Sequence, residues 1–202
     1  MAIFRPQAAV IGGGYLGYQN CGIASFTNRT DEFDWADVYI VVNLKLENSQ
    51  YEQPLNIAGS FEKEPDGGIK DCTLLRRLYY LFDVIGFQGG VTKEGKFEDE
   101  DGVPIDDMCG YLEEKFSPVF PAEPTMDYHC YLYKEWNVKE KRAYTRVVPK
   151  MVRNVTAEIT DFTGYINFCK GKGVIKEYDE STAPANNTAG ARNPQTNTQT
   201  TF

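Results

Sequence analysis

A run of alternating apolar and polar residues, Val38 to Glu47, constrains the fold of this chain more than any other feature. Alternation with a period of two places every second side chain on the same face of a β-strand. The apolar face carries Val38, Ile40, Val42, Leu44 and Leu46. A strand that buries one face and exposes the other is typical of an antiparallel sheet.

The segments on either side predict partners for this strand. Asn48-Ser49 marks a turn, and Gln53 to Ala58 follows as a short strand with Leu55 and Ile57 pointing inward. The two strands therefore form a predicted hairpin. Upstream, Tyr15 to Thr27 has apolar and small residues without a helical period, which favours another extended strand.

A second hairpin is predicted in the C-terminal half. Tyr128 to Trp136 is a strand rich in aromatic residues, Asn137 to Lys141 is its turn, and Ala143 to Val148 is the returning strand. Alternation puts His129, Tyr131 and Tyr133 on one face of the first strand. Tyr128, Leu132, Lys134 and Trp136 share its other face, and Arg142, Tyr144 and Arg146 share one face of the returning strand.

About three helices are predicted besides these strands. A leucine-rich segment has helical spacing; Asp71 or Thr73 can cap its start and Gly86 can end it. A short helix is expected over Ile105 to Phe116, and a last amphipathic helix from Ala157 onward. The apolar positions of the first helix are Leu74, Leu75, Leu78, Leu81, Phe82 and Ile85, and those of the last are Ile159, Phe162, Ile166 and Cys169.

The remaining internal segments are expected to be irregular. Gly89 to Gly102 is an acidic, glycine-bearing loop, and Pro118, Pro121 and Pro124 exclude regular structure around them. The pattern as a whole predicts an α+β fold with a central, mostly antiparallel, barrel-like sheet.

The chain divides into three parts by composition. Residues 1–14 are a flexible lead-in, residues 15–178 form a single domain, and residues 179–202 form a polar tail. We expect the tail to be disordered because it has almost no apolar residue to bury. The five cysteines lie far apart in sequence, which favours buried free thiols in a reducing compartment. Without a signal-peptide core or a membrane-length apolar run, we expect a cytoplasmic protein with no membrane partner.

A glycine motif near the N-terminus raises the question of a nucleotide cofactor. Gly12, Gly14 and Gly17 satisfy the GxGxxG pattern after a short apolar run. A dinucleotide-binding fold needs a helix after the last glycine, but Tyr18 to Gly22 is a poor helix former. We therefore interpret the glycines as a lead-in to the first strand and expect no cofactor.

Catalytic and metal sites are not indicated either. His129 is the only histidine and falls inside a predicted strand, so no Cys/His or Ser/His/Asp arrangement can be assembled. The acidic runs at 98–101 and 106–107 lack the spacing of an EF-hand and are typical of a solvated loop. We expect neither catalysis nor a bound metal.

The charge of the chain is unevenly distributed. The net charge is −8, which taken alone argues against a nucleic-acid partner. Between Asp83 and Asp127, however, there are 12 acidic and three basic residues, whereas between Tyr131 and Tyr178 there are ten basic and five acidic residues. A basic face can therefore exist if the two segments fold onto different sides.

The basic segment also carries the aromatic residues of the second hairpin. Lysine and arginine neutralise phosphates, and exposed aromatic rings stack on bases without reading sequence. The candidate stacking residues are Tyr131, Tyr133, Trp136 and Tyr144, and the candidate phosphate contacts are Lys139, Lys141, Arg142, Arg146, Lys150 and Arg153. An ordinary structural interpretation stays open, because Tyr and Trp are good strand residues and basic strands also serve as soluble edges.

The order of these elements resembles a family of small phage single-stranded DNA-binding proteins from replication and recombination gene sets. The resemblance rests on Asp37–Leu46 followed by Leu55–Phe61, on the helix ending in Asp83–Gly86, and on the late strand Tyr144–Val147. It implies an OB-like barrel, single-stranded DNA as ligand, phage replication proteins as further partners, and action in the host cytoplasm. Proteins of this class often end in an acidic tail with a final aromatic residue; Phe202 fits that pattern, but the acidic residues are missing.

Two other functions are compatible with the sequence. A phage structural or assembly protein would explain the tyrosine-rich, acidic composition and the Asn/Gln/Thr tail without any nucleic acid. Its hairpin would be buried against another subunit. A nucleotide-dependent enzyme using Gly12 to Gly17 would require a parallel sheet after that loop.

Overall fold

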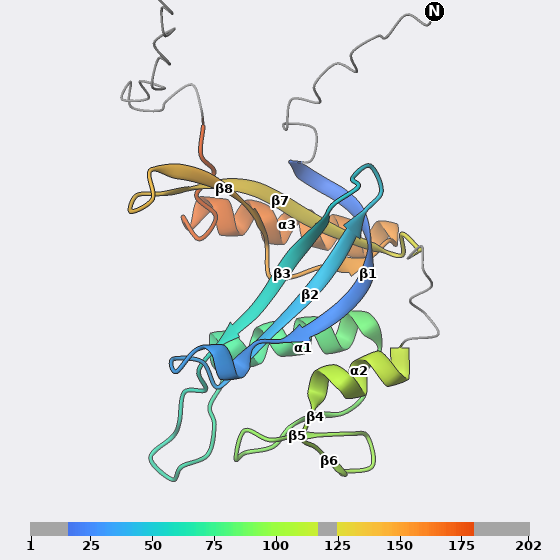
Figure 1. Ribbon diagram of the computed structural model, residues 1–202, viewed down its shortest axis with the longest axis vertical. Coiled ribbons are helices and arrows are strands. Elements are labelled where there is room, and N and C mark those ends of the chain that lie inside the picture. The colour runs from blue at the N-terminus through green and yellow to red at the C-terminus, as the bar shows by residue number, and fades with distance from the viewer. Residues whose placement is uncertain (1–15, 117–124, 180–202) are drawn as a thin grey trace, which may run out of the picture.

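The computed structural model describes residues 16–116 and 125–179, which form an α+β fold with three α-helices and two antiparallel sheets (Figure 1). The large sheet has the strand order β3-β2-β1-β7-β8, and β9 pairs with β7. Its strands are β1 (Gly17–Asn28), β2 (Val38–Leu46), β3 (Glu52–Gly59), β7 (Tyr128–Asn137), β8 (Arg142–Val147) and β9 (Val152–Arg153). The N-terminal lead-in, the three prolines at 118, 121 and 124, and the tail beyond Asp179 lie outside the described residues.

The first three strands form the meander that the alternation predicts. Apolar residues of β2 from Val38 to Leu46 are buried on one face, and Leu55 and Ile57 of β3 pack beside them. The predicted strand over Tyr15 to Thr27 is confirmed from Gly17 on as β1, and Tyr15 lies outside the described residues. Since β1 begins at Gly17, a strand follows the glycine motif where a dinucleotide-binding fold would have a helix.

Strand β1 joins the two halves of the large sheet. It pairs with β2 from Cys21 to Asn28 and with β7 from Gly17 to Cys21. The register with β2 shifts between Ile23 and Ser25, and such an irregularity bends a strand. The sheet is strongly curled: Cα atoms of its edge strands β3 and β8 approach within 8 Å of each other.

The three helices are α1 (Thr73–Ile85), α2 (Met108–Phe116) and α3 (Thr156–Gly171), at the positions that the sequence predicts. Gly86 ends α1 in the left-handed conformation, with φ of 77°, as expected. The prediction for the start of α1 is wrong, because Cys72 stands at the N-cap and no side chain caps the helix. Asp71 instead pairs with Arg76 at 2.5 Å.

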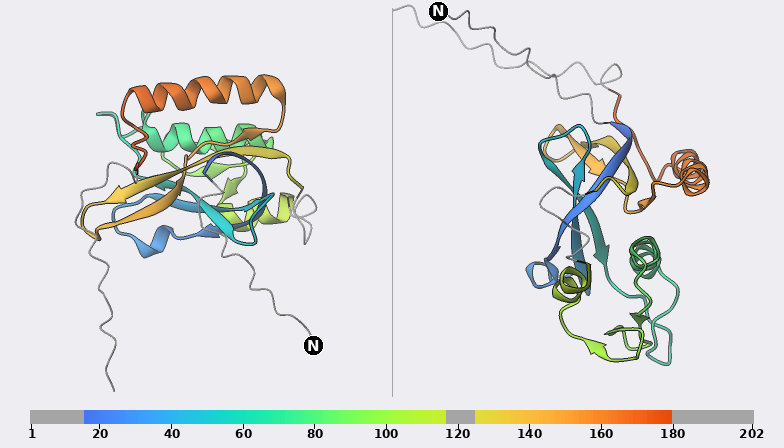
Figure 2. Two further views of the ribbon diagram at one scale, coloured as in Figure 1. Left: turned by 90° about the horizontal axis from the view of Figure 1, so that it is seen from above. Right: turned by 90° about the vertical axis from the view of Figure 1, so that its right-hand side faces the viewer.

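Apolar side chains form two clusters, one on each side of β7. Cys130 and Leu132 of β7 join the first cluster with β1, β2, β3, α1 and α2. Tyr131 points to the opposite side and joins the second cluster, where Phe162 and Ile166 of α3 cover it. Because the sheet curls, α1 and α3 lie on one side of it in Figure 2, although the clusters that they join lie on opposite faces of β7. Strand β7 is therefore covered on both faces where α3 crosses it.

The acidic segment after α1 is not the plain loop that the sequence predicts. It contains β4 (Gly90–Val91), β5 (Phe97–Glu98) and β6 (Pro104–Ile105), which form a small antiparallel sheet. The Asp99 carboxylate accepts hydrogen bonds from the backbone N–H groups of Asp101 and Val103, at 3.0 and 2.9 Å, and so fixes the turn between β5 and β6. Such local hydrogen bonding by aspartate favours a tight turn, which the charge run concealed.

Other sequence expectations concern cysteines and membranes. The five cysteines are buried free thiols, as predicted. Within the described residues, no helix is long and apolar enough to cross a membrane.

Candidate nucleic-acid interface

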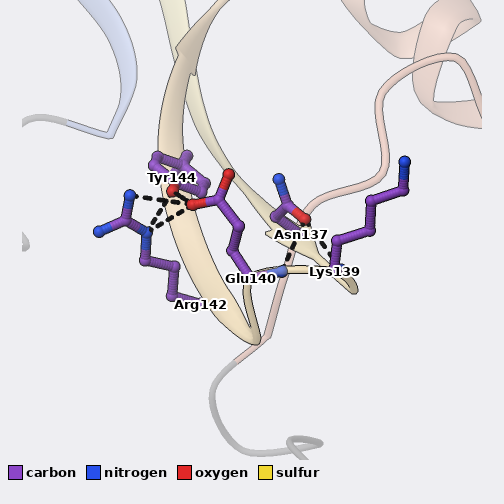
Figure 3. A network of polar contacts seen from close by, with 5 residues as sticks. All are labelled: Asn137, Lys139, Glu140, Arg142 and Tyr144. Atoms are coloured by element: carbon purple, nitrogen blue, oxygen red, sulfur yellow. Dashed lines mark hydrogen bonds and ion pairs between the residues drawn. The ribbon is translucent and has the colours of Figure 1, made fainter.

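The β7–β8 hairpin carries most of the candidate residues, and its turn is built by local chemistry (Figure 3). The side-chain oxygen of Asn137 accepts hydrogen bonds from the backbone N–H groups of Lys139 and Glu140, at 3.0 and 3.1 Å. Lys141 then takes a left-handed conformation with φ of 52°. An Asn that closes a turn onto its own following backbone is a common way to reverse a strand.

The register of the hairpin places three β8 residues in a line. Arg142 lies opposite Asn137, Tyr144 opposite Glu135, and Arg146 opposite Tyr133. The predicted shared face of Arg142, Tyr144 and Arg146 is thus confirmed. We call these three residues the β8 ladder.

The β8 ladder has an aromatic ring between two cations. The guanidinium carbons of Arg142 and Arg146 lie 4.4 and 5.6 Å from the centroid of the Tyr144 ring. Both arginines are exposed and the tyrosine is partly exposed. Cation–π contacts of this kind hold long side chains in a defined orientation at a modest energetic gain.

Two glutamates partly neutralise the ladder. Glu140 pairs with Arg142 at 3.0 Å, and Glu135 pairs with Arg146 at 3.1 Å. The Tyr144 hydroxyl donates to Glu140 and accepts from Arg142 Nε. This network lowers the pKa of Glu140, chiefly through the tyrosine hydrogen bond, and raises the pKa of Arg142 for the same reason. Exposed ion pairs contribute little to stability, so a phosphate can displace the glutamates at small cost.

The two turn lysines extend the positive surface. Lys139 and Lys141 are exposed, and neither forms an ion pair with another residue of the described ranges. Between Lys134 and Arg146 the chain has five basic and two acidic residues, so the hairpin keeps an excess of positive charge.

The structure does not bring all the predicted stacking residues to this surface. Tyr131 is only 5% exposed beneath α3, and its hydroxyl donates to Glu177. Tyr133 is half-buried and packs against the same cluster. Tyr131 is therefore not available for stacking, because α3 covers the face of β7 on which it lies, whereas Tyr133 keeps part of its ring exposed.

Trp136 lies on the other face of the hairpin from the β8 ladder. It is opposite Ala143, and its ring stacks on Tyr178 with centroids 5.0 Å apart and planes 21° apart. The Tyr178 backbone N–H also donates to the Lys134 carbonyl at 2.8 Å. The C-terminal segment thus covers one side of Trp136, and the tryptophan does not continue the Tyr144 surface.

Lys150 and Arg153 lie away from the hairpin tip. The Lys150 ammonium rests on the rings of Tyr80 and Tyr165, 4.4 and 4.6 Å from their centroids, and burial lowers its pKa. Arg153 of β9 forms a 2.5 Å ion pair with Glu158 at the start of α3. Lys150 joins α1 to α3 and is poorly placed to meet a phosphate.

An aromatic group formed by the β1–β2 connection and the start of β2 was not predicted from the sequence. The rings of Phe33 and Tyr39 stack with centroids 5.0 Å apart, and Trp35 lies 5.8 and 6.0 Å from them. Trp35 is 57% exposed. The sequence does place Trp35 in a short acidic loop, Asp31 to Asp37. This position could have identified it as a contact residue, since large exposed aromatic rings often mark contact sites.

The two charged segments lie at opposite ends of the molecule, as the basic-face hypothesis requires. Figure 1 shows the β4–β6 sheet at the bottom and the β7–β8 hairpin at the upper left. Residues 94–107 carry seven acidic residues and one basic residue. The acidic excess is therefore separated from the β8 ladder, and the hairpin has a local excess of basic residues although the net charge of the chain is negative.

The histidine of the chain lies in β7, next to β1. His129 Nδ1 lies 3.0 Å from the Asn20 side-chain oxygen, and burial lowers its pKa. In the described part of the chain no group of His, Cys, Asp and Glu residues could hold a metal ion.

Comparisons of the sequence with models of protein families, with characterised proteins and with solved structures find no match.

Proposed function

We propose that this protein binds single-stranded DNA without sequence preference through the β7–β8 hairpin, and that it acts in phage DNA replication or recombination. The observation that carries the proposal is the β8 ladder, in which Tyr144 lies between Arg142 and Arg146. The phage context comes from the sequence resemblance alone.

The chemistry of the ladder suits a single strand better than a duplex. A base that is not paired can stack on Tyr144 while its neighbouring phosphates meet the two guanidinium groups. Duplex DNA offers no free base face, so the aromatic contact would be lost. Recognition by stacking and charge reads no sequence, which fits a protein that must cover any strand.

We also propose that the large sheet is an OB-like barrel. The order β3-β2-β1-β7-β8, with β3 and β8 approaching each other, supports a five-stranded barrel that is partly open. Loops and strand faces of such barrels bind oligonucleotides. The β7–β8 turn would then be one of the binding loops.

Several of the expected contacts are revised in this proposal. Tyr144 is the stacking residue, and Arg142 and Arg146 meet phosphates, while Lys139 and Lys141 attract the strand from the turn. The other candidates are left out: Tyr131 is buried, Tyr133 is half-buried, Trp136 stacks on Tyr178, Lys150 lies over two rings, and Arg153 pairs with Tyr128 at the end of β7 away from the turn.

The test is a salt series with labelled oligonucleotides. Fluorescence anisotropy of the full chain should show saturable binding to a single strand, weaker binding to the matching duplex, and a linear fall of log affinity with log salt. Absence of single-strand binding at about 50 mM salt, where counterion release favours binding most, would sink the proposal. A structural or assembly role would then take its place.

A further inference from the structure

The β1–β2 connection presents a surface whose chemistry is opposite to that of the hairpin. We call it the aromatic–acidic patch, made of Phe33, Trp35 and Tyr39 together with Asp31 and Asp34. Both aspartates are exposed, and neither forms an ion pair within residues 16–116 and 125–179. Trp35, which follows Asp34 in sequence, is also largely exposed.

The patch is poorly suited to a nucleic acid. Residues 29–37 carry four acidic residues and one basic residue, Arg29. That arginine is already used, because it pairs with Glu32 at 2.5 Å and lies over the rings of Phe33 and Tyr39. A phosphate backbone would meet uncompensated carboxylates, whereas a cationic protein segment would find both charge and aromatic faces.

The chain itself carries a matching cationic segment. The tip of the β7–β8 turn has Lys139 and Lys141, which have no ion-pair partner in the described ranges, and between them and β7 lies Val138, which is 77% exposed. Lysines can lie over exposed aromatic rings or pair with aspartates, and an exposed valine can pack on an indole.

The two surfaces cannot meet within one molecule. The hairpin lies at the upper left in Figure 1, and the β1–β2 connection lies at the lower end of the sheet. A contact between them therefore joins two copies. Because it uses different surfaces on the two partners, it is heterologous and can repeat from copy to copy.

We propose that the aromatic–acidic patch of one copy receives the β7–β8 turn of a second copy, giving head-to-tail self-association. The contact uses Val138, Lys139 and Lys141 at the turn and leaves the β8 ladder on the strand behind it. This inference goes beyond the proposed function and is tested without DNA.

The experiment is sedimentation velocity of the full chain without nucleic acid. At about 50 mM salt the mean mass should rise with protein concentration up to about 100 μM, and at about 500 mM salt it should fall to that of the monomer, since screening weakens exposed charge pairs. A protein that stays monomeric at low salt overturns the proposal.

Charge reversal gives a sharper arm. Asp31→Lys/Asp34→Lys makes both surfaces positive, and Lys139→Glu/Lys141→Glu makes both negative, so each variant alone should associate at least about tenfold more weakly. An equimolar mixture should associate again, because each patch then meets a turn of opposite charge. Failure of the mixture to associate, with both variants folded by circular dichroism, overturns the proposal.

Two further variants keep the result interpretable. Asp31→Asn/Asp34→Asn removes the charge with little change of shape. It should also weaken association, and so it tests the patch even if the charge-reversed variant fails to fold. Trp35→Ala should weaken association while leaving oligonucleotide affinity unchanged. If Trp35→Ala instead leaves the mass unchanged and weakens DNA binding, the patch is a nucleic-acid surface and the proposal is wrong.

Discussion

Removing the arginines of the β8 ladder should change how DNA affinity depends on salt. Each phosphate contact to a single strand contributes roughly 0.7 to the slope of log affinity against log salt. Arg142→Ala or Arg146→Ala should therefore lower the slope by about 0.7. The counterion-release contribution of the removed phosphate contact vanishes near 1 M salt. Each variant should therefore bind about fivefold more weakly than the wild type at 0.1 M salt. The double variant should lose about 25-fold and about 1.4 of slope.

The glutamate partners keep the expected loss within this range. Arg142 and Arg146 are already paired at 3.0 and 3.1 Å, so binding must exchange a carboxylate for a phosphate. Because exposed pairs contribute little, this exchange should reduce the gain only slightly. Anisotropy titrations at four salt concentrations would measure both the slope and the intercept.

Matched controls separate the ladder from a general charge effect. Arg76→Ala removes an exposed arginine that is also ion-paired, at 2.5 Å to Asp71, on α1 rather than on the hairpin. Its slope should equal that of the wild type. Tyr144→Phe keeps the stacking ring and should bind normally, whereas Tyr144→Ala should cost roughly 1–3 kcal/mol. Equal losses in Arg76→Ala and Arg142→Ala would refute the assignment of the contacts to the ladder.

Three other perturbations have outcomes that follow from the structure. Lys150→Ala should destabilise the fold by roughly 1 kcal/mol in urea denaturation, through loss of its cation–π contacts, without changing oligonucleotide affinity; a reduced salt slope would contradict the structural role. Burial lowers the pKa of His129 below its ordinary 6.5, so the folded state favours the neutral ring, and stability should fall as pH drops below about 6.5. Between pH 7.5 and 5.5, His129→Asn should lose less stability than the wild type. An equal loss in both proteins would exclude this linkage. Replacing the acidic residues 98–101 with amides should raise DNA affinity, mainly at low salt where the Debye length is long; a fall in affinity would place this segment in contact with the strand.

The elements with local periodicity could be predicted from sequence. The alternation of β2, the leucine spacing of α1 and the composition of the hairpin depend on neighbours within one element, so they predict β2, α1 and the β7–β8 pair. The short strands were missed for a physical reason. A two-residue strand such as β9 has no period to detect, and only its partner β7 defines it.

The faces of the candidate site could be predicted only in part. Alternation placed Arg142, Tyr144 and Arg146 together, and this holds because the period of a strand is strict. Alternation could not show which face of β7 α3 would cover, since α3 begins nearly twenty residues after β7 ends. Burial of Tyr131 and the contact of Trp136 with Tyr178 are tertiary events, and no local pattern encodes them.

The ion pairs of the β8 ladder explain how an acidic protein can keep a surface for a polyanion. Glu135 and Glu140 hold two guanidinium groups beside Tyr144 and so fix their orientation before any ligand arrives. Pre-organised side chains lose less conformational entropy on binding. The carboxylates are also exposed, so their release to solvent costs little. Affinity then depends on two gains that the glutamates cannot supply, which are stacking on the ring and release of counterions from the strand. The ladder is therefore expected to favour an extended, unpaired polyanion over isolated phosphate or a folded acidic protein.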